Sequence, residues 1–214
     1  DRTLYRTMRY LASHGIFAEQ GSRQFGHTAL SKALRSDAEG SFRPAALLFQ
    51  WLLTSLGEFG QTLKTERSAL THALGEPIFE FLPKHPDKAA MFDAAMPSFH
   101  SGETEAMLDA YDFSRIETLT DIGGGGGMLI AAMLQRHPSM TGVLFDLGHV
   151  VGRATANLEQ AGVAHRCRMV EGSFFDFVPE GAEAYLMRHI IHDWSDEDSV
   201  RILNNCRKAM PTGG

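Results

Sequence analysis

Residues 121–127 hold the pattern in this chain that is best suited to binding chemistry, because an acid there is followed closely by five consecutive glycines. The segment before the glycines, 116–122, predicts a short buried strand, and the segment after them, 128–136, predicts a helix with one apolar side. Glycine lets the backbone turn sharply and lets a ligand approach where a Cβ would otherwise stand. A strand, a glycine turn and a helix N-terminus together predict a nucleotide-type binding site.

The spacing of these glycines narrows the kind of ligand. The dinucleotide fingerprint G-x-G-x-x-G/A fails in every register, because its third position falls on Met128, Leu129 or Ile130. The pattern that fits is acid-x-G-x-G-x-G, which is typical of sites for S-adenosylmethionine. A flexible glycine linker is the alternative, but linkers are not bracketed by a buried strand and an apolar helix. We therefore expect this segment to bind that cofactor.

A second acid, Asp146, ends the next predicted strand, residues 142–146, and stands 19 positions after Gly127. An acid at the end of the strand after a glycine turn can accept hydrogen bonds from both ribose hydroxyls of an adenosyl group. A carboxylate at a strand end could instead cap the following helix. The spacing favours the ligand role.

Two histidines, His189 and His192, lie at the end of a further predicted strand, 184–190, and are followed by Asp193 and Trp194. Because the carboxyl ends of parallel strands form the ligand crevice of such a sheet, we expect these side chains to face the cofactor. His-x-x-His followed by Asp could also bind a metal ion. A third ligand at a suitable spacing is absent from the sequence, so we expect no metal site.

The other predicted elements must position these residues. From residue 113 on, strands alternate with helices, and the near-continuous apolar strands predict an α/β fold with a parallel sheet covered on both faces. The further elements expected there are a helix at 151–161, a strand at 167–170 and a helix that Ser195 caps and that runs to about Met210.

Residues 44–111 predict helices almost throughout. The segment 45–56 is strongly apolar and is expected to be buried between helices, and a helix resumes at 87–96 after a looped stretch with three prolines. Methionine and phenylalanine in that helix, including Met96, are typical core residues. They could also line a pocket for a flat apolar ligand, because thioethers pack adaptably against rings.

The first 36 residues carry a local charge of +4, from six basic residues against two acids. A predicted helix places apolar residues on one face and arginines on another: Leu4, Met8 and Leu11, and Arg2, Arg6 and Arg9. Segments 16–18 and 24–26 then predict a hairpin, and a helix before a hairpin suggests the second half of a winged helix. The arginine face could read DNA, or it could be a solvated or subunit-facing surface. Because the whole chain carries a net charge of −6, we favour the surface and expect no nucleic-acid partner.

Composition sets further limits on the class of protein. The 214 residues are 43% hydrophobic and 21% charged, which suits a globular protein of one large or two small domains. No run approaches the roughly 18 apolar residues of a membrane span, and we expect neither a signal peptide nor a membrane partner. Cys167 and Cys206 are too few and too far apart for a disulfide framework. We interpret them as reduced thiols of a cytoplasmic protein.

Four ordered motifs resemble those of the dimeric S-adenosylmethionine-dependent O-methyltransferases, the group of plant caffeate methyltransferases and bacterial polyketide and antibiotic methyltransferases. They are residues 121–127, Phe-Asp-Leu-Gly-His-Val at 145–150, Glu-Gly-Ser-Phe-Phe at 171–175, and Arg-His-Ile-Ile-His-Asp-Trp-Ser-Asp-Glu at 188–197. The match covers nearly the whole chain, including the winged-helix-like start. It implies a Rossmann-like methyltransferase domain at 103–214, preceded by a helical, winged-helix-like dimerisation domain at 1–102.

The resemblance also implies roles for individual residues. Those at the cofactor are Asp121, Gly123, Gly125, Asp146, Leu147, Ser173, Phe174 and Arg188. The general base is His192, and the acceptor pocket includes Met96 and His189. Two positions depart from the family pattern. Ser173 stands where the family usually has Asp near the adenine, so that contact is weaker or comes from Asp176, and Gly148 replaces a usual proline, which loosens the turn after Asp146.

We therefore expect a homodimeric enzyme that methylates a hydroxyl, preferably an aromatic one, of a small secondary metabolite. A phenol is only about one part in a thousand ionised at pH 7, and a neutral imidazole can remove its proton as attack occurs. N- or C-methylation on the same scaffold is the alternative reaction, and a winged-helix regulator or a catalytically silent ligand-binding scaffold is the alternative class. Because the family continues into a fifth strand after the turn at 211–214 and has dimer helices before residue 1, we expect both domains to be incomplete.

Overall fold

The structure is a computed structural model, and it describes residues 1–38 and 40–211, except for the side chains at 100 and 101. The predicted turn at 211–214 lies outside the described residues from position 212 on. The chain divides into two compact units, residues 1–101 and 102–214.

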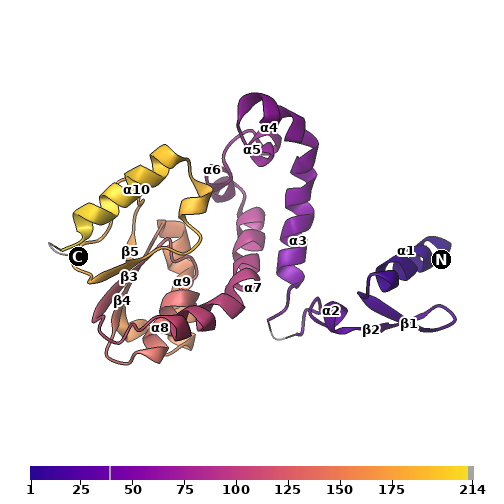
Figure 1. Ribbon diagram of the computed structural model, residues 1–214, viewed down its shortest axis with the longest axis horizontal. Coiled ribbons are helices and arrows are strands. Elements are labelled where there is room, and N and C mark those ends of the chain that lie inside the picture. The colour runs from indigo at the N-terminus through magenta and orange to yellow at the C-terminus, as the bar shows by residue number, and fades with distance from the viewer. Residues whose placement is uncertain (39, 212–214) are drawn as a thin grey trace. The chain divides into compact units, whose positions relative to one another are not determined.

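A four-stranded parallel sheet forms the centre of the second unit (Figure 1). Its strands are β3 (Thr118–Ile122), β4 (Thr141–Asp146), β5 (Cys167–Glu171) and β6 (Ala184–Leu186). They lie in the order β5-β4-β3-β6, and every pairing is parallel. The prediction of an α/β fold with a parallel sheet is therefore confirmed.

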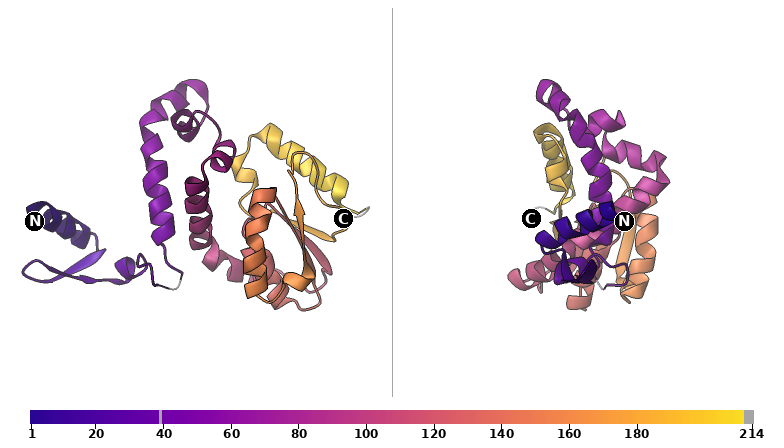
Figure 2. Two further views of the ribbon diagram at one scale, coloured as in Figure 1. Left: turned by 180° about the vertical axis from the view of Figure 1, so that it is seen from behind. Right: turned by 90° about the vertical axis from the view of Figure 1, so that its right-hand side faces the viewer.

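Helices cover both faces of this sheet, as Figures 1 and 2 show. They are α8 (Met128–Arg136), α9 (Gly148–Gln160) and α10 (Asp196–Ala209). Leu144 of β4 belongs to a core cluster with α8 and α9, whereas its neighbour Phe145 belongs to a second cluster with Ile202 and Cys206 of α10. Because successive side chains of a strand point to opposite faces, the apolar run of β4 is buried on both sides.

The strand β6 is shorter than the sequence predicted. It ends at Leu186 and not at Ile190, so the expectation that His189 and His192 lie on a strand end is wrong. His189 has φ 57°, in the left-handed region that a strand cannot contain. The chain then forms a 3-10 turn, Ile191–Asp193, before α10. Ser195 caps α10 as predicted, because its hydroxyl accepts a 3.1 Å hydrogen bond from the N–H of Asp198.

The first unit is mostly helical, apart from one hairpin. Its elements are α1 (Arg2–Ser13), β1 (Phe17–Gly21), β2 (Gln24–His27), α2 (Ala29–Lys32), α3 (Arg43–Leu52), α4 (Phe59–Thr65), α5 (Ala69–Leu74), α6 (Ile78–Phe81) and α7 (Pro86–Ala110), whose last residues belong to the second unit. Its 3-10 turns are Leu53–Glu58 and Leu82–Lys84, and a further 3-10 turn, Ala164–Arg166, belongs to the second unit. The predicted helices of 44–111 are confirmed, and α7 continues beyond Met96 through Pro97.

The predicted helix and hairpin at the start of the chain are also confirmed. β1 and β2 pair antiparallel, with Phe17 opposite His27 and Ala18 opposite Gly26. Figure 1 shows α1 beside this hairpin. Within the described part of the chain no side chain of α1 is buried, and Leu4 is 60% exposed. Its role in dimerisation stays a prediction.

The expectation that 45–56 is buried between helices is wrong for half of that segment. Ala45 and Leu48 are buried, but Phe49, Leu53 and Leu56 are each about half exposed. The buried Ala45 and Leu48 are three positions apart and share one side of α3, whereas Leu53 and Leu56 belong to the 3-10 turn after that helix. None of the described helices is long and apolar enough to cross a membrane.

Candidate functional site

The loop that follows β3 has a backbone conformation that requires glycine. Gly123, Gly125 and Gly127 have φ of 68°, 57° and 76°, where side chains with a Cβ are strained. The N–H groups of Gly123 and Gly124 both point to the carbonyl of Phe145, at 2.8 and 3.4 Å, and this ties the loop to β4. Gly127 is the N-cap of α8, so the free N–H groups of that helix open onto the loop.

The glycines differ in what surrounds them. A Cβ at Gly123 would lie 2.3 Å from Cδ1 of Ile190, and a Cβ at Gly124 would lie 2.3 Å from Cδ1 of Leu144. A Cβ at Gly125 would meet no atom within 4 Å. At Gly123 and Gly124, neighbouring side chains of the protein leave no room for a Cβ. Gly125 instead faces open space that a ligand can fill.

Asp146 stands beside this open space, at the end of β4. Its Oδ2 accepts a 2.8 Å hydrogen bond from the N–H of Gly125, and its Oδ1 accepts a 2.7 Å bond from the N–H of Leu147. Burial raises the pKa of this carboxyl, and the two N–H groups oppose that rise. The structure therefore brings Gly125, Asp146 and Leu147 together, as the sequence predicted.

Asp121 lies beneath the loop and is only 2% exposed. Its Oδ2 has no hydrogen-bond partner among the described residues, and it lies close to Gly124. The pKa of Asp121 is raised to about 7, mainly by burial and to a smaller extent by the charge of Asp146, while the charge of Arg188 opposes the rise. A buried carboxylate oxygen without a partner is costly, and a polar group of a bound ligand or a water molecule would remove that cost.

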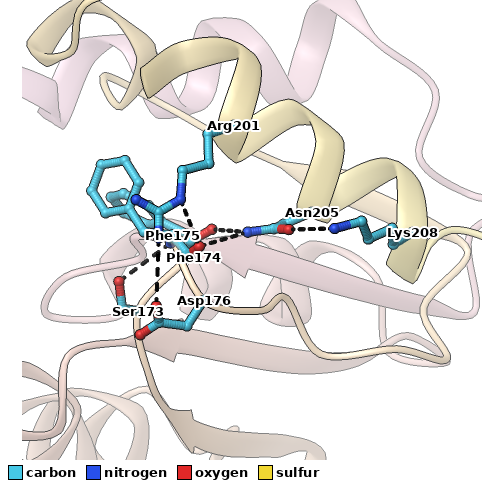
Figure 3. A network of polar contacts seen from close by, with 7 residues as sticks. All are labelled: Ser173, Phe174, Phe175, Asp176, Arg201, Asn205 and Lys208. Atoms are coloured by element: carbon cyan, nitrogen blue, oxygen red, sulfur yellow. Dashed lines mark hydrogen bonds and ion pairs between the residues drawn. The ribbon is translucent and has the colours of Figure 1, made fainter. Parts of the chain in front are cut away.

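The turn after β5 carries Ser173 and Phe174. The hydroxyl of Ser173 accepts a 3.2 Å hydrogen bond from the N–H of Phe175, and its carbonyl accepts from the N–H of Asp176 at 2.9 Å. The ring of Phe174 faces the glycine loop, since its Cε1 would lie 3.8 Å from a Cβ at Gly123. Asp176 forms a 3.7 Å ion pair with Arg201 (Figure 3). The expectation that Ser173 or Asp176 contacts the adenine of the cofactor stays a prediction.

The segment after β6 carries His189 and His192, and each ring lies near a different carboxylate. Nε2 of His189 lies 2.8 Å from Oε2 of Glu103, and Nε2 of His192 lies 3.5 Å from Oδ1 of Asp193. The two rings are 5.3 Å apart, and the side chain of His192 is 61% exposed. Burial raises the pKa of the Asp193 carboxyl, and both histidines oppose that rise.

Several residues of this site gave no signal in the sequence. Glu103 lies 86 positions before His189, and Thr104 accepts a 2.7 Å hydrogen bond from Arg188 across 84 positions. Asn157 of α9 donates a 2.8 Å bond to the carbonyl of Gly126 and steadies the glycine loop. No local pattern predicts such contacts, because packing alone makes them.

Two other predictions concern Met96 and a metal site. Met96 is partly buried on α7 in the first unit, and its place in an acceptor pocket stays a prediction. Within residues 1–38 and 40–211, no three side chains of His, Cys, Asp or Glu are grouped to hold a metal ion.

Known proteins are similar to this chain in sequence and in fold. The phenazine O-methyltransferase PhzM of Lysobacter antibioticus is 38% identical over 212 residues, which are 99% of this chain and 62% of that protein. The crystal structure of LaPhzM matches with a TM-score of 0.92 at 37% identity, over 100% of this chain and 64% of that one. The chain thus spans less than two thirds of the length of these relatives.

Two further matches bear on ligand and reaction. NcsB1 from neocarzinostatin biosynthesis, solved with S-adenosylmethionine and 2-hydroxy-5-methyl naphthoic acid, has a TM-score of 0.87 at 29% identity over 100% of this chain and 66% of that one. The 8-amino-8-demethylriboflavin N,N-dimethyltransferase of Streptomyces davaonensis is 33% identical over 97% of this chain and 61% of that protein. A family model described as an O-methyltransferase domain matches residues 56–214, so the chain belongs to the O-methyltransferase family.

Proposed function

We propose that the protein transfers the methyl group of S-adenosylmethionine to a hydroxyl, preferably a phenolic one, of a small secondary metabolite. The observation that carries this proposal is the pairing of Gly125 with Asp146 at the carboxyl edge of the parallel sheet. There a carboxylate borders space that no protein atom fills. The family membership and the naphthoic acid bound to NcsB1 support the same reaction.

The residues around the glycine loop fit this cofactor. Asp146 would accept hydrogen bonds from the ribose hydroxyls, and the positive φ of Gly125 leaves the backbone open to close approach. The buried Oδ2 of Asp121 offers an unused acceptor next to the loop. Leu147, Ser173, Phe174 and Arg188 would complete the cofactor site. When bound, S-adenosylmethionine supplies a methyl group that is activated by a sulfonium.

His192 would act as the general base. It takes the proton of the acceptor hydroxyl onto Nδ1, so that the oxygen gains negative charge as it attacks. Oδ1 of Asp193, 3.5 Å from Nε2, stabilises the imidazolium that forms. His189 holds the wall of the acceptor pocket through its contact with Glu103.

The test is incubation of the full-length protein with methyl-labelled S-adenosylmethionine and a panel of phenols, phenazines and naphthoates. We expect label on an acceptor oxygen, and no transfer by Asp146→Ala. Glu159→Ala is the matched control, because it truncates an exposed carboxylate on α9 in the same way. Cofactor binding without transfer to any acceptor would point instead to the silent scaffold.

N-methylation is the second candidate reaction, and the riboflavin relative favours it. The cofactor residues would be the same for both reactions, so they cannot distinguish them. Matched phenol and aniline acceptors in the same panel separate the two reactions by the atom that carries the label.

We also propose a homodimer in the cytoplasm. The first unit supports a dimer because it exposes large apolar side chains on neighbouring turns, namely Leu53, Leu56 and Leu63. Sedimentation of the full-length protein tests this, and a monomer at micromolar concentration would contradict it.

We expect that Arg2, Arg6 and Arg9 do not bind DNA. A gel shift at physiological salt that is lost in Arg6→Glu would support the alternative function of a winged-helix regulator.

A further inference from the structure

Helix α10 carries one buried amide, Asn205, which is 8% exposed and lies among apolar neighbours. Ile202, Cys206 and Ala209 of the same helix belong to the core cluster on this face of the sheet. A buried amide in such surroundings is costly unless its polar atoms are hydrogen-bonded. An apolar side chain would fill the space without that cost, so the contacts of Asn205 indicate what it does.

Both N–H groups of this amide are directed to one short turn (Figure 3). Nδ2 of Asn205 donates to the carbonyl of Phe174 at 3.0 Å and to the carbonyl of Phe175 at 2.9 Å. Its Oδ1 accepts a 3.3 Å hydrogen bond from Nζ of Lys208. Both Nδ2 and Oδ1 of Asn205 are therefore hydrogen-bonded, and Nδ2 binds the carbonyls of two consecutive residues.

Arg201, one helical turn before Asn205, holds the same turn from its outer side. Its Nε donates a 3.1 Å hydrogen bond to the carbonyl of Phe175, and its guanidinium lies 5.2 Å from the centre of the Phe175 ring. It also pairs with Asp176 at 3.7 Å. Arg201, Asn205 and Lys208 share one face of α10, since residues three and four apart lie on the same side of a helix.

The turn that these side chains hold lies next to the glycine loop of the proposed cofactor site. The Phe174 ring packs edge-on against Trp194, 5.7 Å between centres, and its Cε1 faces Gly123 of the glycine loop. Phe175 packs against the other side of this aromatic cluster, 4.7 Å from Trp194. The position of Phe174 relative to the loop thus depends on the peptide groups that Asn205 binds.

We propose that Asn205 is a positioning residue that sets the affinity of the site for the adenosyl end of the cofactor, through its two hydrogen bonds to the carbonyls of Phe174 and Phe175. This inference rests on the proposed function. Asn205 touches neither the glycine loop nor the histidines in any contact described above, so it acts through the turn. Its loss should weaken cofactor binding and leave the chemistry at His192 unchanged.

The test is Asn205→Asp in the full-length protein, because a carboxylate has nearly the same shape and cannot donate. Calorimetric titration with S-adenosylhomocysteine should show a Kd raised about 5- to 30-fold, the value of one or two lost hydrogen bonds. The KM for S-adenosylmethionine should rise by the same factor. The kcat at saturating cofactor and the KM for the acceptor should stay within about twofold, since the lost contact acts on cofactor binding alone.

Asn204→Asp is the matched control, because Asn204 is the exposed neighbour on the same helix and undergoes the same chemical change. We expect its Kd and kinetics to equal those of the wild type. Arg201→Met keeps the aliphatic stem of a 57% exposed side chain and removes one donor from the turn. It should fold even where Asn205→Asp does not, and it should raise the Kd by a smaller factor.

The outcomes separate this inference from the proposed function. A wild-type protein that binds no S-adenosylhomocysteine would overturn the proposed function. Wild-type binding that both variants retain at full strength would overturn only the role of Asn205. A kcat that falls as far as the cofactor affinity would also overturn it, since that result is expected of general damage to the fold.

Discussion

The N–H of Gly125 donates a 2.8 Å hydrogen bond to Oδ2 of Asp146, and this contact joins the loop after β3 to the end of β4. The two residues lie 21 positions apart, at the carboxyl ends of adjacent parallel strands. The bond orients the carboxylate while Gly125 leaves the space in front of it free of protein atoms. The proposed cofactor site is thus held in place by this contact between the backbone of Gly125 and the side chain of Asp146.

Gly125→Val is expected to fold and to lose cofactor binding. The valine side chain would occupy the open space and block the approach of a ligand, while its strain at φ 57° would cost about 1–2 kcal/mol of stability. Gly162→Val is the matched control, because Gly162 has φ 72° and also faces open space, on the loop after α9. Calorimetry with S-adenosylhomocysteine measures both. Tight binding by a folded Gly125→Val protein would exclude this cofactor site.

His192→Ala is expected to leave the Kd for S-adenosylhomocysteine unchanged and to lower turnover by roughly 10²–10⁴, the usual effect of losing a positioned base. The defect should shrink toward pH 10, where a phenol ionises unaided. Asp193→Asn should cause a smaller loss, because it removes only the charge that faces Nε2 of His192. A pH-independent defect in His192→Ala would contradict the role of base.

His189→Ala is expected to act mainly on the KM for the acceptor. In the proposed role, the ring lines the acceptor pocket in the ground state and the transition state alike, so its loss should weaken acceptor binding without slowing the chemical step. Steady-state kinetics with varied acceptor measure the effect. If His189→Ala loses turnover while His192→Ala keeps it, the roles of the two histidines are reversed.

Asp121 should make the folded state less stable as the pH rises from about 4 to about 7. Burial raises its pKa from an ordinary value of 3.8 to about 7, so in this window the folded protein binds a proton that the unfolded chain has released. The stabilising effect of that proton is complete below pH 4 and is lost as the pH passes 7. Asparagine at position 121 does not ionise, so the stability of Asp121→Asn does not fall in this way.

Denaturant unfolding of both proteins at pH 4 and pH 8 measures this effect. The advantage of Asp121→Asn over the wild type should grow by on the order of 4 kcal/mol between these two values, from about 1.4 kcal/mol for each unit of pKa. Titrating groups that do not interact with Asp121 act equally on both proteins and cancel in the difference. Equal differences at the two pH values would show that Asp121 has an ordinary pKa in the folded protein.

Local patterns were sufficient to predict much of the fold. The helix expected at 128–136 is α8 with the same bounds, and the strand expected at 142–146 is β4 with one residue more. These predictions succeeded because apolar periodicity and glycine report the backbone conformation of their own neighbourhood. The same holds for the cap at Ser195 and for the hairpin of β1 and β2.

The sequence by itself determined the alternation of strands and helices, the glycine loop and the acid at the end of β4, because each depends on residues that are close in the chain. The early end of β6 at Leu186, the contact of Glu103 with His189 and the hold of Asn205 on Phe174 were decided only by the tertiary structure. So was the raised pKa of Asp121, since burial by distant segments removes water from its carboxyl. Contacts between residues far apart in the chain depend on how whole elements pack, and no local pattern encodes them.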